Sequence, residues 1–392
     1  MGQENSYILV DNYLYVNRRI SLITLYLLLF FKAKPFEYFE QPTKFNVINA
    51  SKLPVIRAIR VFKFVWLFQI QKKVEKKSTF LDIHCYGHCA LLLAEKECKV
   101  FDLQKEMVYT IYPPSRSESY IRKKLEQVKM AGELMVGPKY ISANIKERIV
   151  VEEYINAYRL NYSVCDSTDL FPLLKKMVAV RGQREVNLLE YLKDRRATIT
   201  SLLNEKIMCD ISSEENMLVI EEFKDQISTC IQQIYKGESV YLCLSHGDLW
   251  HGNLLKDQTR IRVIDWNTLD VRNCYYDFFF MSFVAAKKEN IFVHLTSENS
   301  VLLLDRINQH FLLMQSNLSD VIEPLYRNKT DANLQRYIFY LEFIELKLQL
   351  IKKGHINYIN GLLNWIERFT SFEKNVGAIL FSNVHDEGNM AK

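Results

Sequence analysis

Polar side chains that can do chemistry gather in one passage, residues 244–255, which reads LSHGDLWHGNLL. Shortly after it, residues 263–266 (VIDW) place Asp265 at the end of an apolar run. Residues 241–244 and 260–264 are rich in apolar and β-branched side chains and predict strands. Carboxylates and an amide that emerge from strand ends converge on one point, as metal-assisted phosphoryl transfer requires.

The residue types in this passage predict separate roles. Asp265 is expected to be the chief carboxylate ligand of Mg²⁺, and Asn253 a neutral amide ligand beside it. Asp248 is expected to accept the proton of an attacking hydroxyl and to hold that oxygen in line. His246 is expected to brace the loop, where Gly247 permits a tight backbone turn. The sequence therefore predicts His246 and Asp248 as catalytic residues and Asn253 and Asp265 as metal ligands.

The spacing of these residues resembles a known family. Residues 246–253 and 264–266 are similar to the patterns H-G-D-x-x-x-x-N and I-D-W/F of the aminoglycoside phosphotransferase and choline kinase-like family. The opening H-G-D-L-W is also similar to that of the fructosamine kinases. The resemblance extends from Cys89 to the C-terminus, and Asp277 resembles a later family aspartate that anchors the segment after the metal strand. It implies a two-lobed protein-kinase-like fold that phosphorylates a small-molecule hydroxyl with ATP and Mg²⁺.

The expected fold class is α+β, with a small antiparallel β lobe, a large mainly helical lobe and a helical N-terminal extension. We expect residues 1–79 to form the extension, residues 80–156 the small nucleotide-binding lobe, and residues 157–392 the large catalytic and acceptor-binding lobe. Residues 90–94, 98–103 and 107–112 predict three short strands joined by polar turns, and a helix is expected after Pro113 and Pro114.

The resemblance also implies nucleotide contacts in the small lobe. Residues 148–155 look like the strand and hinge that join the lobes, and in the family the hinge backbone holds the adenine ring. Glu153 and Tyr154 are therefore predicted to bind the nucleotide. Glu126, in the predicted helix, is expected to be the glutamate that pairs with the phosphate-clamping cation. The alternative for Glu126 is a solvent-facing helix residue.

One position departs from the family pattern. The third strand of such a lobe usually carries a lysine or arginine, and the matching position here is Thr110. Lys99, on the adjacent predicted strand, replaces it if the register differs. Without a basic residue, catalysis is expected to be slow. The alternative function is then a catalytically weak pseudokinase that acts as a nucleotide-binding, membrane-attached scaffold.

The N-terminal part predicts contact with a membrane surface. The apolar run at residues 20–31 is too short to span a bilayer, which needs about 20 residues. Arg57, Arg60 and Lys63 recur every three residues and predict a basic stripe on a helix, and more lysines follow up to Lys77. We expect the segment from Arg57 to Lys77 to meet an anionic membrane, and the protein to be cytoplasmic and peripheral on the inner face of that membrane. The alternative is a core helix with a solvated basic face.

The expected contact with a membrane makes an acceptor at that surface plausible. The expected acceptor is a sugar or amino-alcohol group of a cell-envelope glycan or lipid precursor.

The composition does not favour nucleic acid as a partner, and one cluster of residues raises the question of zinc binding. A net charge of +5 over 392 residues does not indicate nucleic-acid binding. The eight cysteines mostly stand singly within apolar runs, which fits reduced thiols in the cytosol. His84, Cys85, His88 and Cys89 could hold zinc, but no clear second ligand pair follows them. The alternative is a strand and turn with incidental ligand-type residues.

Overall fold

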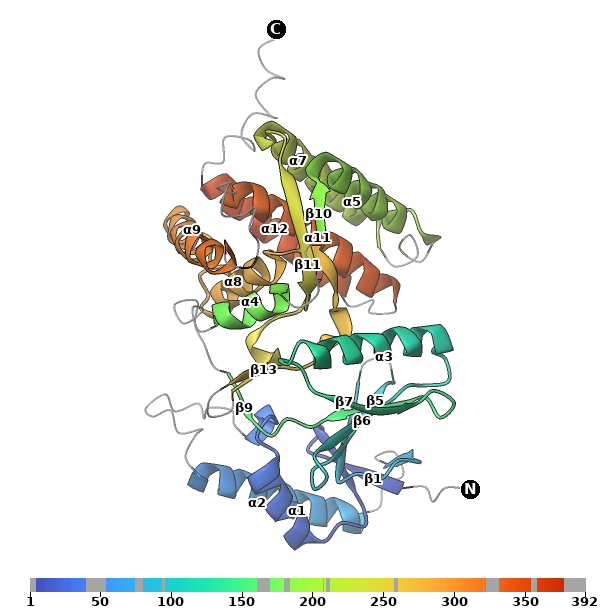
Figure 1. Cartoon of the computed structure of the whole chain (residues 1–392). Coiled ribbons are helices and arrows are strands. Elements are labelled where there is room, and N and C mark those ends of the chain that lie inside the picture. Colours follow the sequence, from blue (N-terminus) through green and yellow to red (C-terminus); the bar gives the residue numbers. More distant parts are fainter. Residues whose placement is uncertain are drawn as a thin grey trace. The chain divides into compact units, whose positions relative to one another are not determined.

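The computed structural model describes residues 5–39, 54–74, 80–93, 96–160, 170–179, 184–206, 208, 212–256, 260–319, 321, 331–353 and 358–376. The chain forms two compact units. Unit 1 comprises Met1–Leu160 and His251–Asn267, and unit 2 comprises Asn161–Trp250 and Thr268–Lys392. Figure 1 shows that strands dominate unit 1 and helices dominate unit 2.

Unit 1 is built on an antiparallel sheet with the strand order β3-β1-β2-β4-β5-β6-β8-β7. Its strands are β1 (Asn5–Val10), β2 (Leu14–Asn17), β3 (Phe80–Ile83), β4 (Cys89–Leu92), β5 (Cys98–Asp102), β6 (Met107–Ile111), β7 (Tyr140–Asn144) and β8 (Ile149–Glu153). A smaller sheet with the order β13-β12-β9 contains β9 (Tyr158–Arg159), β12 (Leu254–Lys256) and β13 (Ile261–Val263). The predicted meander corresponds to β4, β5 and β6, and the predicted hinge strand corresponds to β8.

The first described residues form two strands, although a helical extension was expected there. Strand β1 pairs with β2 and β3, and β2 pairs with β4, so both belong to the same sheet as the nucleotide-lobe strands. The sequence analysis expected a helical extension over residues 1–79 and did not predict these two strands. Short strands of this kind are stabilised by side-chain packing against their neighbours in the sheet, and a reading of local patterns does not detect that packing.

The described part of unit 1 also contains the helices α1 (Leu22–Lys32), α2 (Pro54–Val74) and α3 (Glu118–Glu133) and the short helical turn η1 (Glu37–Phe39). Helices α1 and α2 pack together and share a core with one face of the sheet. Among the described residues, no helix is both long enough and apolar enough to cross a membrane.

The expected basic stripe on α2 is wrong at Arg57. This side chain is only 4% exposed, and it donates hydrogen bonds to the carbonyl oxygens of Leu29 (2.7 Å) and Phe30 (2.8 Å). These carbonyl groups lie in the last turn of α1, where a helix leaves acceptors without intrahelical partners. Arg57 therefore ties α2 to the end of α1 and does not face solvent. Lys76 and Lys77 lie outside the described residues.

Unit 2 is mainly helical, which confirms the α+β class. Its helices are α4 (Phe171–Ala179), α5 (Leu188–Leu203), α7 (Glu214–Ile234), α8 (Tyr276–Lys288), α9 (Ser297–Ser319), α11 (Ala332–Lys352) and α12 (Tyr358–Asn375). A small antiparallel sheet joins β10 (Arg184–Asn187), β11 (Ser239–Ser245) and β14 (Asp270–Asn273). Two short helical turns, η5 (His251–Asn253) and η6 (Trp266–Thr268), flank the β12–β13 hairpin, which belongs to unit 1. Aromatic side chains of α8, α11 and α12 pack around Phe369 in the core.

Candidate active site

The predicted catalytic loop begins where β11 ends in unit 2, and an aspartate on α8 holds its backbone. Asp277 accepts a hydrogen bond from the His246 N–H at 2.7 Å and another from the Gly247 N–H at 2.9 Å, one on each carboxylate oxygen. Asp277 is 4% exposed and lies in the first turn of α8, where the helix dipole favours a negative charge. The carboxylate therefore fixes the loop to α8, in line with the anchoring role that the resemblance implied.

His246 shapes the backbone that presents Asp248. Its side chain is fully buried, and its Nδ1 accepts a hydrogen bond from the Asp248 N–H at 3.2 Å. Its carbonyl oxygen accepts another from the Thr268 hydroxyl at 2.7 Å. Gly247 has φ +83°, and a Cβ there would lie 2.8 Å from both the Thr268 carbonyl oxygen and an Arg272 nitrogen. This geometry fits a bracing role for His246, with the glycine required by its conformation and by its close neighbours.

The two predicted metal ligands come from one hairpin of unit 1. Asn253 ends η5 directly before β12, and Asp265 follows β13. The Ile264 N–H donates to the Asn253 carbonyl oxygen at 2.9 Å, which continues the pairing of the two strands. Arg159 donates to the Gly252 carbonyl oxygen and so fixes the turn before Asn253. The hairpin therefore keeps Asn253 and Asp265 on adjacent chain segments.

The exposure and the surroundings of the Asp265 carboxylate suit the binding of a cation that also contacts phosphate. Its side chain is 42% exposed, and the Asn267 amide donates to its Oδ1. The residue has φ +65°, a left-handed conformation that is uncommon outside glycine and often marks functional positions. No group of three or more His, Cys, Asp or Glu side chains able to hold a metal occurs among the described residues. One carboxylate and one amide still fit Mg²⁺, which completes its shell with phosphate oxygens and water.

A lysine from the large sheet lies beside this carboxylate. Lys99 Nζ is 3.5 Å from Asp265 Oδ1. Lys99 pairs directly with Thr110 across β5 and β6, so both side chains project from the same face of the sheet. Burial lowers the pKa of Lys99, but the attraction of Asp265 and Glu152 outweighs burial and raises it. The basic residue in this part of unit 1 is thus on β5, one strand away from Thr110.

Glu152 is a residue of this group that the sequence analysis missed. Burial raises the pKa of its carboxyl group, the nearby Lys99 opposes that rise, and Asp265 adds to it. A charged residue directly after the apolar residues of β8 was the available signal. Glu126, the predicted partner of the clamping cation, is instead 62% exposed and pairs with Lys129 at 3.0 Å. The structure therefore supports the solvent-facing alternative for Glu126.

The two predicted hinge residues make contacts within unit 1. Glu153 Oε2 accepts from Arg262 at 2.9 Å, and the Glu153 N–H donates to the Lys139 carbonyl oxygen at 2.9 Å. The Tyr154 hydroxyl donates to the Lys32 carbonyl oxygen at 2.7 Å, and its N–H also has a backbone acceptor at 2.8 Å. Both N–H groups are engaged inside the protein, and contact of these residues with adenine stays a prediction.

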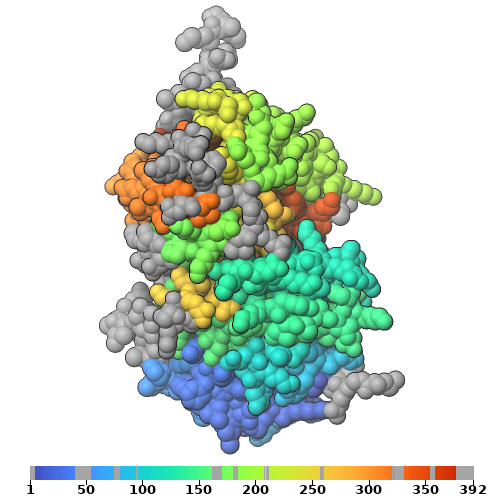
Figure 2. Space-filling model, in the orientation of Figure 1, coloured from blue at the N-terminus to red at the C-terminus, as the bar shows by residue number. Residues whose placement is uncertain are grey.

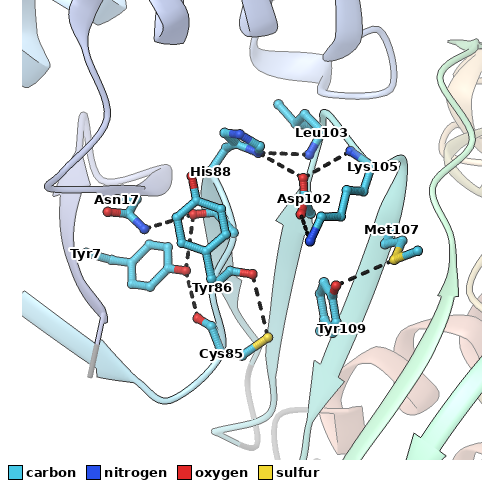
Figure 3. Close-up of polar contacts among 11 residues, drawn as sticks. Tyr7, Asn17, Cys85, Tyr86, His88, Asp102, Leu103, Lys105, Met107 and Tyr109 are labelled. Carbon is cyan, nitrogen blue, oxygen red and sulfur yellow. Dashed lines mark hydrogen bonds and ion pairs between the residues drawn. The ribbon is translucent and has the colours of Figure 1, made fainter. Parts of the chain in front are cut away.

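In the cluster of His84, Cys85, His88 and Cys89, the side chains of His88 and Cys85 contact groups of the protein itself. Figure 3 shows His88 with its Nδ1 directed at the Leu103 N–H (3.1 Å) and at Asp102 Oδ1 (3.4 Å). Burial lowers the pKa of His88, and Asp102 opposes that shift. The Cys85 thiol donates to a backbone carbonyl oxygen, and burial raises the pKa of the Cys89 thiol on β4. Hydrogen bonds of His88 and Cys85 thus lie within the protein, and the described residues contain no group of three or more His, Cys, Asp or Glu side chains placed to hold a metal.

The chain is similar to phosphotransferases of small molecules. The model of the Phosphotransferase enzyme family (APH) matches residues 168–305. A choline kinase from Cryptosporidium parvum is 14% identical over 74% of this chain and 90% of its own, with a TM-score of 0.46. An ethanolamine kinase from Plasmodium vivax is 13% identical over 73% and 83%, with a TM-score of 0.45. An aminoglycoside phosphotransferase from Streptomyces rimosus, solved with ADP and streptomycin, is 10% identical over 65% and 92%, with a TM-score of 0.41. No curated protein sequence matches the chain.

The family match covers the residues from which the resemblance was drawn. His246, Asp248, Asn253 and Asp265 all lie within residues 168–305. The match confirms the predicted resemblance to this family, and the likeness to fructosamine kinases stays a prediction. The chain has one β-rich unit and one mainly helical unit.

Proposed function

We propose that this protein is an ATP- and Mg²⁺-dependent phosphotransferase that acts on a hydroxyl group of a small molecule. The observation that carries this proposal is the loop at residues 246–253. It lies inside the segment that matches the phosphotransferase family, and Asp277 fixes its backbone with both carboxylate oxygens. A rigid loop matters because phosphoryl transfer depends mainly on positioning and electrostatic stabilisation.

Each residue of the proposed site has one task. Asp248 accepts the proton of the acceptor hydroxyl and orients its oxygen, and His246 holds the backbone of Asp248 in place. Asn253 and Asp265 would hold Mg²⁺, which neutralises charge on the phosphates when it is bound. Lys99, which lies beside Asp265, supplies a positive charge for the phosphate oxygens.

The acceptor is proposed to be a sugar or amino-alcohol group of a cell-envelope glycan or lipid precursor. This choice rests on the two N-terminal helices, whose surface suits a membrane and so favours an acceptor found there. Because the phosphoryl donor is cytosolic ATP, the proposal also places the protein in the cytoplasm.

The competing function is a catalytically weak pseudokinase that serves as a membrane-attached scaffold. It was motivated by Thr110, which stands where a basic residue is usual. The position of Lys99, 3.5 Å from Asp265, supports the enzyme instead, because it supplies the missing cation from the neighbouring strand.

Thermal shift and turnover test the two functions. With ATP and Mg²⁺ we expect a rise in melting temperature for the wild type and for Asp248→Asn, but not for Asp265→Asn. With a panel of sugar and amino-alcohol acceptors, phosphate transfer should require both aspartates. Asp305→Asn, at an exposed position on α9, is the matched control and should behave as the wild type. A nucleotide-induced shift without transfer to any acceptor would favour the scaffold, and no shift in the wild type would refute both functions.

A further inference from the structure

Helices α1 and α2 carry large apolar side chains on their exposed sides. On α2 the exposed fractions are 68% for Val55, 63% for Ile59, 63% for Phe62, 59% for Trp66, 43% for Ile70 and 57% for Val74. On α1 they are 75% for Ile23, 47% for Leu27 and 58% for Phe31. Steps of three or four residues place each set along one side of its helix. These nine residues form what we call the apolar surface.

The apolar surface is not needed to build the core. Helix α1 buries Leu25 and Leu29, and α2 buries Val61, Phe64 and Phe68 against the sheet. Each of these five buried positions lies two residues from an exposed apolar one, which corresponds to roughly opposite sides of a helix. Both helices are therefore apolar on the side that faces the sheet and on the side that faces away. Scattered apolar residues on a surface are ordinary, but a continuous set of this size marks an interaction site.

The two helices lie together at the surface of unit 1. They contact each other, and both pack on the same core cluster, so their outer sides form one layer. Figure 1 shows α1 and α2 side by side against the sheet. In Figure 2 the blue N-terminal residues form a continuous part of the surface of unit 1.

Charge around the apolar surface selects the kind of partner. Residues 22–32 and 54–74 contain no aspartate or glutamate. Lys63 and Lys73 are exposed on α2, and Lys63 lies within one helical turn of Ile59 and Trp66. An apolar helix surface that carries aromatic residues, on two helices whose only charged residues are basic, suits the boundary between lipid headgroups and acyl chains of an anionic bilayer. A second copy would bring the same positive charges together.

We propose that the apolar surface of α1 and α2 inserts into the headgroup region of an anionic membrane, with α2 lying in the plane of the bilayer. The 21 residues of α2 give a length of about 30 Å along the membrane. The apolar side chains supply most of the binding, and Lys63 and Lys73 add attraction to anionic lipids. This inference differs from the basic stripe expected from the sequence, because Arg57 is buried inside unit 1. It needs neither nucleotide nor turnover and is independent of the proposed activity.

Vesicle binding by the full chain tests the inference. We expect co-sedimentation with phosphatidylcholine vesicles that contain phosphatidylglycerol, and at least tenfold weaker binding to phosphatidylcholine alone. The double variant Phe62→Ser/Trp66→Ser should lose at least tenfold in affinity for the anionic vesicles. The matched control Leu312→Ser/Leu313→Ser replaces residues of α9 that are 63% and 48% exposed and should bind as the wild type. Circular dichroism and melting temperature establish that each variant is folded.

Fluorescence gives a second readout that does not depend on affinity. Insertion should shift the emission of Trp66 to shorter wavelength on addition of anionic vesicles, and Trp66→Phe should bind while losing most of that shift. Failure of the wild type to bind anionic vesicles would overturn the inference. So would unchanged binding by folded Phe62→Ser/Trp66→Ser. A lipid-free dimer in sedimentation velocity, abolished by the same double variant, would assign the surface to a second copy instead.

Discussion

Lys99 Nζ lies 3.5 Å from Asp265 Oδ1, although the family pattern predicts the basic residue at the position of Thr110 on the next strand. Directly paired residues of antiparallel strands have Cβ atoms about 5 Å apart and project from the same face of the sheet. A lysine side chain is longer than that separation. A cation on β5 can therefore reach the region that a cation on β6 would reach, so the chain keeps the charge while changing the strand that carries it.

This relationship predicts that Lys99 is essential and Thr110 is not. Lys99→Met should lower kcat/KM by about 100-fold or more, since a preorganised charge on the transferring group contributes on this scale. It should also weaken the thermal shift given by ATP and Mg²⁺. Thr110→Val, which keeps the shape of a buried side chain, should retain most of the activity.

A double variant sharpens the same test. Lys99→Met/Thr110→Lys moves the cation to the family position on the same face of the sheet, and part of the lost activity should return. Equal activity of Lys99→Met and the wild type would contradict the role assigned to Lys99.

The sequence predicted the family resemblance better than the arrangement of the strands around it. The residue types and spacing at 246–253 and 264–266 were sufficient to predict the resemblance to phosphotransferases that the family match confirms, while the roles assigned to the single residues stay predictions. The sequence analysis could name Lys99 only as the alternative to Thr110, since the choice of strand depends on pairing between distant segments. Glu152 was missed for the same reason: its position near Lys99 depends on the pairing of β8 with β6 and of β6 with β5.

The orientation of α2 could not be predicted from helical periodicity alone. A three-residue spacing predicted that Arg57 would share an exposed stripe with Arg60 and Lys63, yet Arg57 is buried against the end of α1. Helical periodicity shows which residues share a side of a helix, but not which side meets the core when both sides are apolar. The buried hydrogen bonds of the guanidinium group decide that orientation here.

Asp277 is predicted to contribute to both stability and activity. Asp277→Asn retains one acceptor oxygen but loses the negative charge and one of the two acceptors for the N–H groups of His246 and Gly247. Leaving a buried N–H without a partner costs about 1–3 kcal/mol. We expect a fall of that size in the free energy of unfolding, measured by urea denaturation, together with a lower kcat. Unchanged stability would show that the loop does not depend on this anchor.

Lys347 is predicted to select acceptors by charge. Its Nζ lies 5.7 Å, 5.2 Å and 5.7 Å from the ring centroids of Phe280, Phe343 and Tyr358. Burial lowers the pKa of Lys347, and the Asp248 carboxylate opposes that shift, so the two groups interact. A cation that interacts with the proposed base should attract acceptors that carry a phosphate or carboxylate and repel those that carry an ammonium group, so among the proposed acceptors it favours sugars over amino-alcohols.

Two substitutions separate charge from packing at Lys347. Lys347→Met keeps most of the side-chain volume and removes the charge, so KM should rise for anionic acceptors and fall for cationic ones. Lys347→Arg keeps the charge and should preserve the order of preference. Steady-state kinetics with matched anionic, neutral and cationic alcohols measure the effect. The same ratio of KM values in Lys347→Met and the wild type would rule out this selection.

Glu342 is predicted to make stability depend on pH. Burial raises the pKa of its carboxyl group from 4.5 to about 7, although hydrogen bonds from the Tyr191 hydroxyl and the Asn273 N–H oppose the rise. Between these two pH values the folded chain holds a proton that the unfolded chain has released. The free energy of unfolding therefore falls as pH rises from 4.5 to about 7, by up to about 3 kcal/mol from this group.

The variant Glu342→Gln tests this dependence, because glutamine resembles the protonated carboxyl group and keeps the acceptor oxygen for Tyr191 and Asn273. The second carboxylate oxygen of Glu342 has no hydrogen-bond partner among the described residues, and the side chain borders a cavity of about 340 Å³. The amide nitrogen of glutamine would take the place of this second oxygen. Urea denaturation from pH 4.5 to 8 should show that the variant lacks the decline of the wild type and is more stable above pH 7. Parallel curves for the two proteins would mean that Glu342 is ionised throughout this range, and that burial is offset by its hydrogen-bond donors.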